Sequence, residues 1–355
     1  MASQGDEAEQ RQAVIKCESV YKIFGNNAQS LLQNAQGKID AKDALAAGCI
    51  VGVNNVSFEV SEGELLVIMG LSGSGKSTLL RCISRLTDAT GGKIFVDGQD
   101  LLTMNSKQLM EVRRDKMGMV FQNFGLLPHK TVLENIAFPL QVKGINTKDS
   151  IERAMNMAEL VGLSGRENYF PRELSGGQQQ RVGIARSLAV EPDIWFLDEP
   201  FSALDPLIRK EMQDEFLRLQ SVLNKTILFV THDFDEALRL ADRIAIMKEG
   251  VIEQLDTPAN IVLDPATEYV RKFTQEVPRE KVLKIEDVMD PYDSTEEMSD
   301  IKVSKNAIIE VVAEQILSQD KAVGVVDDND NIVGSLHSSH VINVLFGNRS
   351  QEQQG

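Results

Sequence analysis

An apolar run that leads into a glycine-rich loop constrains this chain more than any other feature. Residues 65–69 read Leu-Leu-Val-Ile-Met and predict a buried strand, and residues 70–77 read Gly-Leu-Ser-Gly-Ser-Gly-Lys-Ser. A helical pattern then runs from Thr78 to Ile83. This order of strand, loop and helix matches G-x-x-x-x-G-K-[ST] in the structural context that the pattern requires.

The loop predicts a binding site for the phosphates of a nucleoside triphosphate. Glycines let backbone N–H groups curl around an anion, and the start of the following helix adds partial positive charge. Lys76 is expected to reach the β- and γ-phosphates, and the Ser77 hydroxyl to ligate Mg²⁺. The competing interpretation is a glycine loop that only turns a corner. The residues expected to bind nucleotide in this segment are Gly70, Ser72, Gly73, Gly75, Lys76, Ser77 and Thr78.

A second apolar strand ends in two acidic residues. Residues 194–197 are followed by Asp198 and Glu199, a pair that is costly at the end of a buried strand unless a cation or hydrogen bonds compensate it. Asp198 suits a Mg²⁺ ligand acting through water, and Glu199 suits a base that polarises the attacking water. The alternative is a surface acid pair without catalytic work.

Composition bounds the class of protein. The chain has 355 residues, with 42% hydrophobic and 25% charged residues, which is ordinary for a globular protein of two or three domains. No apolar run approaches the ~20 residues of a spanning helix, and the polar, acidic start MASQGDEAEQ does not resemble a secretory signal. The three cysteines lack metal-binding spacing and indicate reduced thiols.

The negative charge is unevenly distributed. The formal net charge is −16, and residues 276–355 carry 16 acidic and 7 basic residues. More than half of the excess therefore lies in the last 80 residues. This acidity argues against nucleic acid as a partner, and against unaided binding to anionic lipid.

Alternating strands and helices predict an α/β protein with a largely parallel sheet. Residues 14–24 alternate as an edge strand, and residues 26–52 read as an insertion with helical pattern near 30–36 and 41–47. Further segments with clear patterns are strands at 53–60, 65–69, 93–96, 194–197 and 226–230, and a mostly helical subdomain at about 124–190.

The chain is expected to hold two domains and two tails. An acidic tail at 1–13 precedes a first domain at 14–275, and a second unit at 280–346 precedes a disordered tail at 347–355. In the second unit the pattern predicts a helix at 284–289, an acidic linker at 290–300 and a helix at 307–318. Two strands follow, at 322–326 and 332–336, joined by an acidic turn.

The run Leu-Ser-Gly-Gly-Gln-Gln-Gln-Arg at 174–181 resembles the signature of the ATP-binding-cassette (ABC) ATPases, and the resemblance covers about residues 14–265. Alone, a Ser-Gly-Gly run is more simply an N-capped helix. The resemblance implies that this helix start closes on the ATP held by a second copy of the chain, through Ser175, Gly176, Gly177 and Gln178.

The same resemblance assigns roles to further residues. Gln122 matches the glutamine that contacts Mg²⁺ and water and senses the membrane partner, and Asp205 matches the loop that crosses the dimer interface. His232 matches the switch histidine that donates to the γ-phosphate. Phe24 matches the aromatic residue that stacks on adenine, with Tyr21 as the alternative and plain core packing as a competitor for both.

Finer similarities point to a subfamily. Residues 121–129 resemble the importer form of the glutamine loop, and the insertion at 26–52 with residues 69–76 looks like the glycine betaine/proline betaine importers. Segments 287–289 and 324–334 resemble a CBS module, of which that subfamily often has two in tandem and this chain has room for one. Ligand sensing and simple dimer stabilisation both remain open for that module.

The resemblance therefore implies a complete set of expectations. The fold is α/β: an ABC-type P-loop NTPase domain with antiparallel β and helical subdomains, followed by a small α+β CBS-like domain. With ATP and Mg²⁺, a head-to-tail dimer would power a separate multi-span permease, served indirectly by an external solute-binding protein. The solute would be glycine betaine, proline betaine, choline or trimethylamine N-oxide, and the chain would lie peripherally on the cytoplasmic face of the inner membrane.

Two other functions compete with this reading. A soluble ABC ATPase that acts on nucleic acid or ribosomes predicts two fused cassettes or a coiled-coil insertion with basic patches, whereas this chain shows one cassette and an acidic balance. An exporter ATPase is the third option. The loop after Gln122 and the CBS-like segment count against it.

Overall fold

The computed structural model describes residues 12–34, 38–122, 124–275, 277–293, 295 and 297–346. Its contacts divide the chain into two compact units, Met1–Leu255 and Asp256–Gly355, and each is described by itself. The predicted disordered tail at 347–355 and most of the predicted acidic tail at 1–13 lie outside the described residues.

An antiparallel sheet opens the first unit. Its strand order is β2-β1-β4-β5, with bounds Ile50–Ser61, Ala13–Phe24, Gly91–Val96 and Gln99–Asp100. Strand β1 pairs antiparallel with β2 on one side and with β4 on the other. The prediction of an edge strand at 14–24 is therefore wrong. Alternating polarity there reflects one buried face and one open face, and this pattern does not depend on the number of neighbouring strands.

The predicted insertion forms two short helices beside this sheet. Helices α1 (Ala28–Asn34) and α2 (Ala41–Ala46) fall on the two helical patterns, and β2 already begins at Ile50. The insertion therefore ends about three residues earlier than the sequence predicts. A small apolar cluster holds it to the sheet, consisting of Tyr21, Ile23, Ile39, Ala44 and Cys49.

A six-stranded sheet carries the phosphate loop. Its order is β10-β9-β3-β8-β7-β6, with bounds Val251–Asp256, Arg243–Lys248, Leu65–Met69, Thr226–Thr231, Ile194–Asp198 and Met117–Val120. The pairs from β9 through to β6 are parallel. Every residue of β3, β7 and β8 is buried. Parallel strands covered on both faces read as continuous apolar runs, which is why the sequence predicted these three correctly.

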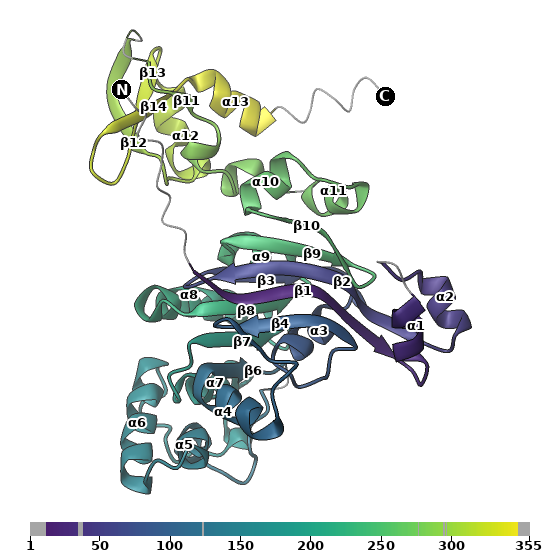
Figure 1. The fold of residues 1–355 in the computed structure, drawn as a ribbon. Helices are drawn as coiled ribbons and strands as arrows, with labels where there is room; N and C mark the ends of the chain where they lie inside the picture. Colours follow the sequence, from purple (N-terminus) through teal and green to yellow (C-terminus); the bar gives the residue numbers. More distant parts are fainter. Residues whose placement is uncertain are drawn as a thin grey trace, which may run out of the picture. The chain divides into compact units, whose positions relative to one another are not determined.

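Helices surround this sheet and extend beyond β6 and β7 (Figure 1). The bounds are α3 Lys76–Ile83, α4 Ser106–Lys116, α5 Val132–Val142, α6 Thr147–Leu160, α7 Gly176–Leu188, α8 Pro206–Leu223 and α9 Phe234–Leu240, with a 3-10 turn η1 at Pro171–Glu173. Helices α5, α6 and α7 contact one another and form the helical part that the sequence predicted at about 124–190.

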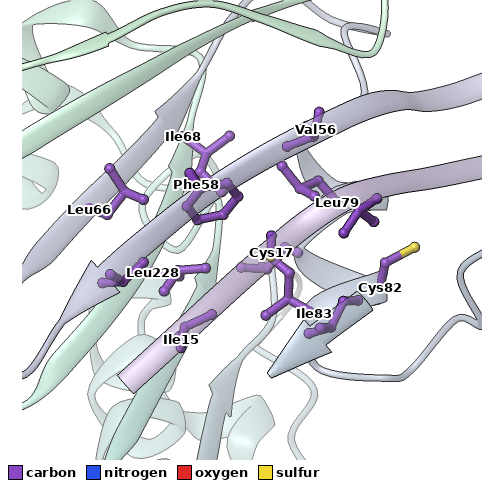
Figure 2. Close-up of a cluster of buried hydrophobic side chains, with 14 of the residues drawn as sticks. Ile15, Cys17, Val56, Phe58, Leu66, Ile68, Leu79, Cys82, Ile83 and Leu228 are labelled. Carbon is purple, nitrogen blue, oxygen red and sulfur yellow. The ribbon is translucent and has the colours of Figure 1, made fainter. Parts of the chain in front are cut away.

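The main core lies between the two sheets. Figure 2 shows side chains from β1 and β2, such as Ile15 and Phe58, facing Ile68 of β3 and Leu79 of α3. All three cysteines are free and buried, Cys17 and Cys82 in this core and Cys49 in the insertion cluster. Burial raises the pKa of both core thiols, that of Cys82 to about 11, and keeps them protonated at neutral pH.

The second unit holds a four-stranded sheet with the order β11-β14-β13-β12. Strands β13 (Ala322–Val326) and β14 (Ile332–Leu336) pair antiparallel, and both match their predicted bounds. The remaining elements are α10 Pro258–Leu263, α11 Glu268–Thr274, α12 Ile309–Leu317, α13 Ser338–Phe346, β11 Asp290–Pro291, β12 Met298–Ser304, and the 3-10 turns η2 Arg279–Lys281 and η3 Ile285–Asp287. The CBS-like assignment of this unit stays a prediction.

Two predictions for the second unit are wrong. The helix expected at 284–289 is only the three-residue turn η3, and the linker expected at 290–300 contains β11 and the start of β12. Strand β12 pairs parallel with β13, and β11 pairs antiparallel with β14. Both partners come later in the chain, so local polarity gives no sign of this pairing.

Helices α10 and α11 belong to the second compact unit, although the sequence assigned residues up to 275 to the first domain. Ala259 of α10 packs in the same buried cluster as Leu283, Ile309 and Val323. Among the described residues, no helix is both long and apolar enough to cross a membrane.

Candidate nucleotide site

The phosphate loop depends on glycine at two tight contacts. Gly70 has φ of 150°, and a Cβ there would lie 2.2 Å from the Met247 carbonyl oxygen. Gly75 has φ of 104°, and a Cβ there would lie 2.2 Å from the Gly52 carbonyl oxygen. Neither position tolerates a side chain, because the backbones of neighbouring segments already occupy that space.

Lys76 opens helix α3 and folds into the loop. Its Nζ donates hydrogen bonds to the carbonyl oxygens of Gly70 at 2.8 Å and Leu71 at 3.1 Å. The side chain is 5% exposed, and this burial lowers the pKa of the ammonium group against the opposing charges of Glu199 and Asp198. The structure thus places a buried cation inside the curve of the loop, where a phosphate would meet it.

One turn of helix α3 faces the acidic end of β7. The Ser77 hydroxyl donates to Asp198 Oδ1 at 2.6 Å, and Arg81 Nη2 lies 3.3 Å from Asp198 Oδ2. Asp198 is 3% exposed, so these two partners compensate its buried charge. Arg81 was not among the site residues predicted from the sequence. Its spacing of four residues after Ser77 was the available signal, since such residues share a helix face.

Three strand ends converge on Glu199. Gln122, two residues after β6, donates through Nε2 to Glu199 Oε2 at 3.3 Å. His232, directly after β8, places Nδ1 3.1 Å from the same oxygen. Glu199 itself follows β7 with φ of 48°, held by a hydrogen bond from its amide to the Val230 carbonyl. The structure thus brings together the three residues predicted from the sequence to be catalytic, Gln122, Glu199 and His232.

The signature segment forms the start of helix α7. The Ser175 hydroxyl accepts from the Gln178 amide at 3.3 Å, and the Gln178 side chain accepts from the Ser175 amide at 3.0 Å. These two bonds form a capping box. A Cβ on Gly177 would lie 2.7 Å from Ile208 Cγ2, and one on Gly176 would lie 3.4 Å from Leu204 Cδ2.

Helix α8 begins beside that segment. Asp205 caps it by accepting from the Ile208 amide at 3.1 Å, and both Asp205 and Ser175 are exposed. The starts of α7 and α8 therefore lie side by side and form the helix-start surface, residues 175–178 and Asp205, in which Ser175, Gly176 and Asp205 are exposed and Gly177 is buried. Its N–H groups carry the partial positive charge that an anion needs.

Phe24 and Tyr21 have different environments. Phe24 is 44% exposed and Tyr21 is 8% exposed, with burial raising the pKa of the tyrosine hydroxyl. Lys22 Nζ lies 4.8 Å from the centroid of the Phe24 ring. A Cβ on Gly52 would lie 2.9 Å from the Phe24 ring and 3.1 Å from the Thr78 methyl group, so this ring lies close to the start of α3.

A groove of about 500 Å³ lies between α4, β6, α5 and α7. Apolar side chains line it, among them Phe121, Leu127 and Phe138, together with the guanidinium groups of Arg114 and Arg186. Within the described residues, no cluster of three or more histidine, cysteine or acidic side chains has the geometry of a metal centre.

Comparison with known proteins gives one consistent family. Residues 53–202 match the family model described as ABC transporter. The chain is 77% identical over 333 residues, 94% of its length and 97% of the relative, to a trimethylamine N-oxide transport system ATP-binding protein, TmoW, of Pelagibacter ubique. It is 51% identical over 276 residues, 78% of the chain and 66% of the relative, to the glycine betaine transport ATP-binding protein OpuAA of Bacillus subtilis.

A solved structure agrees with the fold. The dimeric ATP-binding cassette MJ0796, in a post-hydrolysis state bound to ADP and phosphate, is 33% identical with a TM-score of 0.58, over 69% of this chain and 98% of that chain. The predicted cassette fold is thereby confirmed. Together with the glycine loop, the acidic strand end and the signature helix, these similarities show that the chain belongs to the ABC transporter family, as an ATP-hydrolysing subunit of its quaternary amine group.

Proposed function

We propose that this chain hydrolyses ATP to drive the uptake of trimethylamine N-oxide, or of a closely related betaine or choline, through a separate membrane permease. The convergence of Gln122, Glu199 and His232 beside the phosphate loop carries the catalytic part of the proposal. The 77% identity to a trimethylamine N-oxide transport protein supports the choice of solute.

The phosphates of ATP would enter the loop at residues 70–78. There they offer Lys76 charged oxygens in place of the two carbonyls that it now contacts. The Ser77 hydroxyl, the Asp198 carboxylate and the Gln122 amide are oxygen donors of the kind that Mg²⁺ prefers, and the Ser77 and Asp198 oxygens lie 2.6 Å apart. When bound, Mg²⁺ would neutralise charge that develops on the phosphates.

Glu199 is the base in this proposal. Its Oε1 would accept a proton from the attacking water, and the hydrogen bonds that Gln122 and His232 make to Oε2 fix the direction of the carboxylate. His232 is 53% exposed at its side chain, which leaves it open to the γ-phosphate. Phe24 would stack on adenine, because its exposed ring lies near Thr78 and the ring of Tyr21 is buried.

The helix-start surface would complete the site of a second copy. Ser175 and Gly176 are exposed at the start of α7, where a bound phosphate would meet the partial positive charge of the helix end, and Asp205 lies beside them. ATP held by one copy would then bridge to this surface of the other copy, and hydrolysis would release it. The dimeric state of the similar cassette supports this arrangement.

The groove beside β6 would receive a segment of the permease. Its lining is mostly apolar and includes residues of β6, the strand that leads directly to Gln122. The chain would thereby lie on the cytoplasmic face of the inner membrane, with an external solute-binding protein acting indirectly. Its second unit would be a CBS-like appendage. The acidic surface gives no support for nucleic acid as a partner.

Uptake by the whole transporter tests this function. Cells that express the chain with its permease and solute-binding protein are expected to accumulate labelled trimethylamine N-oxide faster than labelled glycine betaine or choline. The matched control is Glu199→Gln, which keeps size and hydrogen bonding and should reduce the ATPase kcat by about 10²–10⁴-fold while ATP still binds. Uptake that persists in the control, or retained hydrolysis, would contradict the proposal.

A further inference from the structure

Arg186, near the end of helix α7, holds two successive carbonyl groups of the loop that follows Gln122. Its Nη1 donates to the Gly125 oxygen at 2.7 Å and its Nη2 donates to the Phe124 oxygen at 3.0 Å. Charge-assisted bonds of this kind are stronger than neutral ones, and the planar guanidinium fixes both acceptors in one geometry. One side chain of α7 therefore sets the path of this loop.

The held residues belong to a tight turn that contains Gln122. The Phe124 amide donates to the Phe121 carbonyl at 3.1 Å, which closes the turn around Gln122. Phe124 has φ of 57° and Gly125 has φ of 60°. A phenylalanine in this left-handed region is strained, so the turn needs an outside contact to keep its shape. Arg186 supplies that contact.

A second anchor holds the chain just beyond the turn. Asn135 of α5 is fully buried, and its side chain accepts from the Leu127 amide at 2.8 Å and donates to the Leu127 carbonyl at 3.1 Å. The segment between β6 and α5 is thus fixed by one polar side chain from α5 and one from α7. Of these two, Arg186 holds the residues nearer to Gln122.

We propose that Arg186 is a positioning residue that ties the orientation of Gln122 toward Glu199 to the position of helix α7. Helix α7 begins at the helix-start surface and ends at Leu188, so it connects the surface for a second copy to the turn around Gln122. Arg186, Gly125 and Phe121 also line the groove, and a segment bound there presses on the same contacts. The proposal rests on the proposed function of Gln122 and Glu199.

The test compares two arginines that each donate to a backbone carbonyl, Arg186 of α7 and Arg218 of α8. Arg186→Met keeps the aliphatic stem and removes both hydrogen bonds. Arg218→Met on α8 is the matched control, because Arg218 Nη2 donates to the Leu160 carbonyl at 2.8 Å, away from the loop and from the signature segment. We expect Arg186→Met to lower the ATPase kcat about 10- to 100-fold, while affinity for ATP changes by less than about twofold. Arg218→Met is expected to leave kcat close to that of the wild type.

A double-mutant cycle identifies the route of the effect. If Arg186 acts through Gln122, then adding Arg186→Met to Gln122→Ala causes little further loss of kcat. A glycine at 124 adopts a positive φ without strain, so Phe124→Gly is expected to restore part of the kcat lost in Arg186→Met. Additive losses, or an equal loss in Arg218→Met, would overturn the proposal.

Hydrogen exchange without nucleotide separates this proposal from the proposed function. Amides of residues 124–127 are expected to exchange faster in Arg186→Met than in wild type, and at the wild-type rate in Arg218→Met. The single tryptophan, Trp195, donates through Nε1 to the Ser187 hydroxyl at 2.9 Å, so unchanged emission from Trp195 shows that α7 still packs on β7. Unchanged exchange in Arg186→Met overturns the inference even if the chain hydrolyses ATP. Faster exchange in a chain that does not hydrolyse ATP contradicts the proposed function alone.

Discussion

Glu236 carries a buried carboxyl group on helix α9, four residues after His232. It is 4% exposed, and it accepts a hydrogen bond from Gln213 Nε2 at 3.0 Å. Burial raises the pKa of this carboxyl group, and hydrogen bonds from Thr231 and Gln213 lower it. The negative charge of Asp233 also raises the pKa, and the positive charge of Arg209 lowers it. The folded protein therefore holds this proton more tightly than the unfolded chain does.

The sign of the pH dependence follows from that shift. As pH rises above about 4.5, the unfolded chain loses the Glu236 proton first, so the stabilisation from the protonated carboxyl is lost as pH passes through the raised folded value. Glu236→Gln keeps the side chain neutral. Urea unfolding is expected to show the variant gaining stability relative to wild type as pH increases from about 4.5 to 7.

Asp235→Asn is the matched control, because it makes the same charge change at an exposed site one residue away on α9. Its stability relative to wild type should vary less with pH than that of Glu236→Gln. An identical pH profile for the two variants would show that burial of Glu236 has no energetic consequence for folding.

Single side chains were predicted best where spacing alone defines a motif. Gly70, Lys76 and Ser77 stand at fixed offsets, and the structure brings them to the end of β3 as the pattern requires. Arg81 and Arg186 belong to no such motif in the sequence analysis, and their partners lie 117 and about 60 residues away. Contacts of this kind depend on tertiary packing. Spacing places Arg81 on the helix face of Ser77, but neither the contact of Arg81 with Asp198 nor that of Arg186 with the loop follows from the sequence alone.

At the level of elements, helix α7 combines a structural cap with the surface offered to a second copy. Ser175→Arg is expected to abolish ATP-induced dimerisation, because a long cation would occupy the helix-start surface. Binding of ATP to the isolated chain should persist, since the phosphate loop is intact. Light scattering with ATP in the Glu199→Gln background, where hydrolysis does not release the dimer, measures the effect.

Ser175→Ala provides the control for the loss of the cap. Both substitutions remove the hydroxyl that accepts from the Gln178 amide, at about 0.5–2 kcal/mol of stability, and only the arginine adds bulk. The alanine variant should still dimerise, more weakly than wild type. Equal dimerisation of the arginine variant and wild type would remove residues 175–178 from the interface.

Elements with their own local signal were predicted, and elements formed by distant pairing were not. Strands β3, β7 and β8 are continuous apolar runs, and β13 and β14 flank a turn rich in aspartate and asparagine. Strand β12 has mostly polar residues and only Val303 buried, so its strand state comes from pairing with β13. In the short turn η3 the Lys284 amide donates to the Asp287 carboxylate at 2.8 Å, a bond that also occurs at the start of true helices.

For the molecule as a whole, the division into two units predicts where a shortened chain should end. A chain that stops after Asp256 keeps β10 and removes the second unit, whereas one that stops after Gln275 keeps α10 and α11 without the cluster that covers Ala259. We expect the longer form to aggregate more and bind more of an apolar fluorescent dye. Thermal unfolding with and without ATP compares the stability of the two forms. A longer form that aggregates less than the shorter one would favour the boundary at 275.

The three cysteines of the first unit lie in two different apolar clusters, so their reaction rates report how often each cluster opens. Cys17 and Cys82 lie in the large core between the sheets, whereas Cys49 lies in the small cluster that holds the insertion. A thiol reagent reaches each one only when its surroundings open, and a small cluster opens more often than a large core. The rate at which Cys49 reacts therefore measures how often the insertion beside Phe24 separates from the sheet. The rates at Cys17 and Cys82 measure how often the two sheets separate.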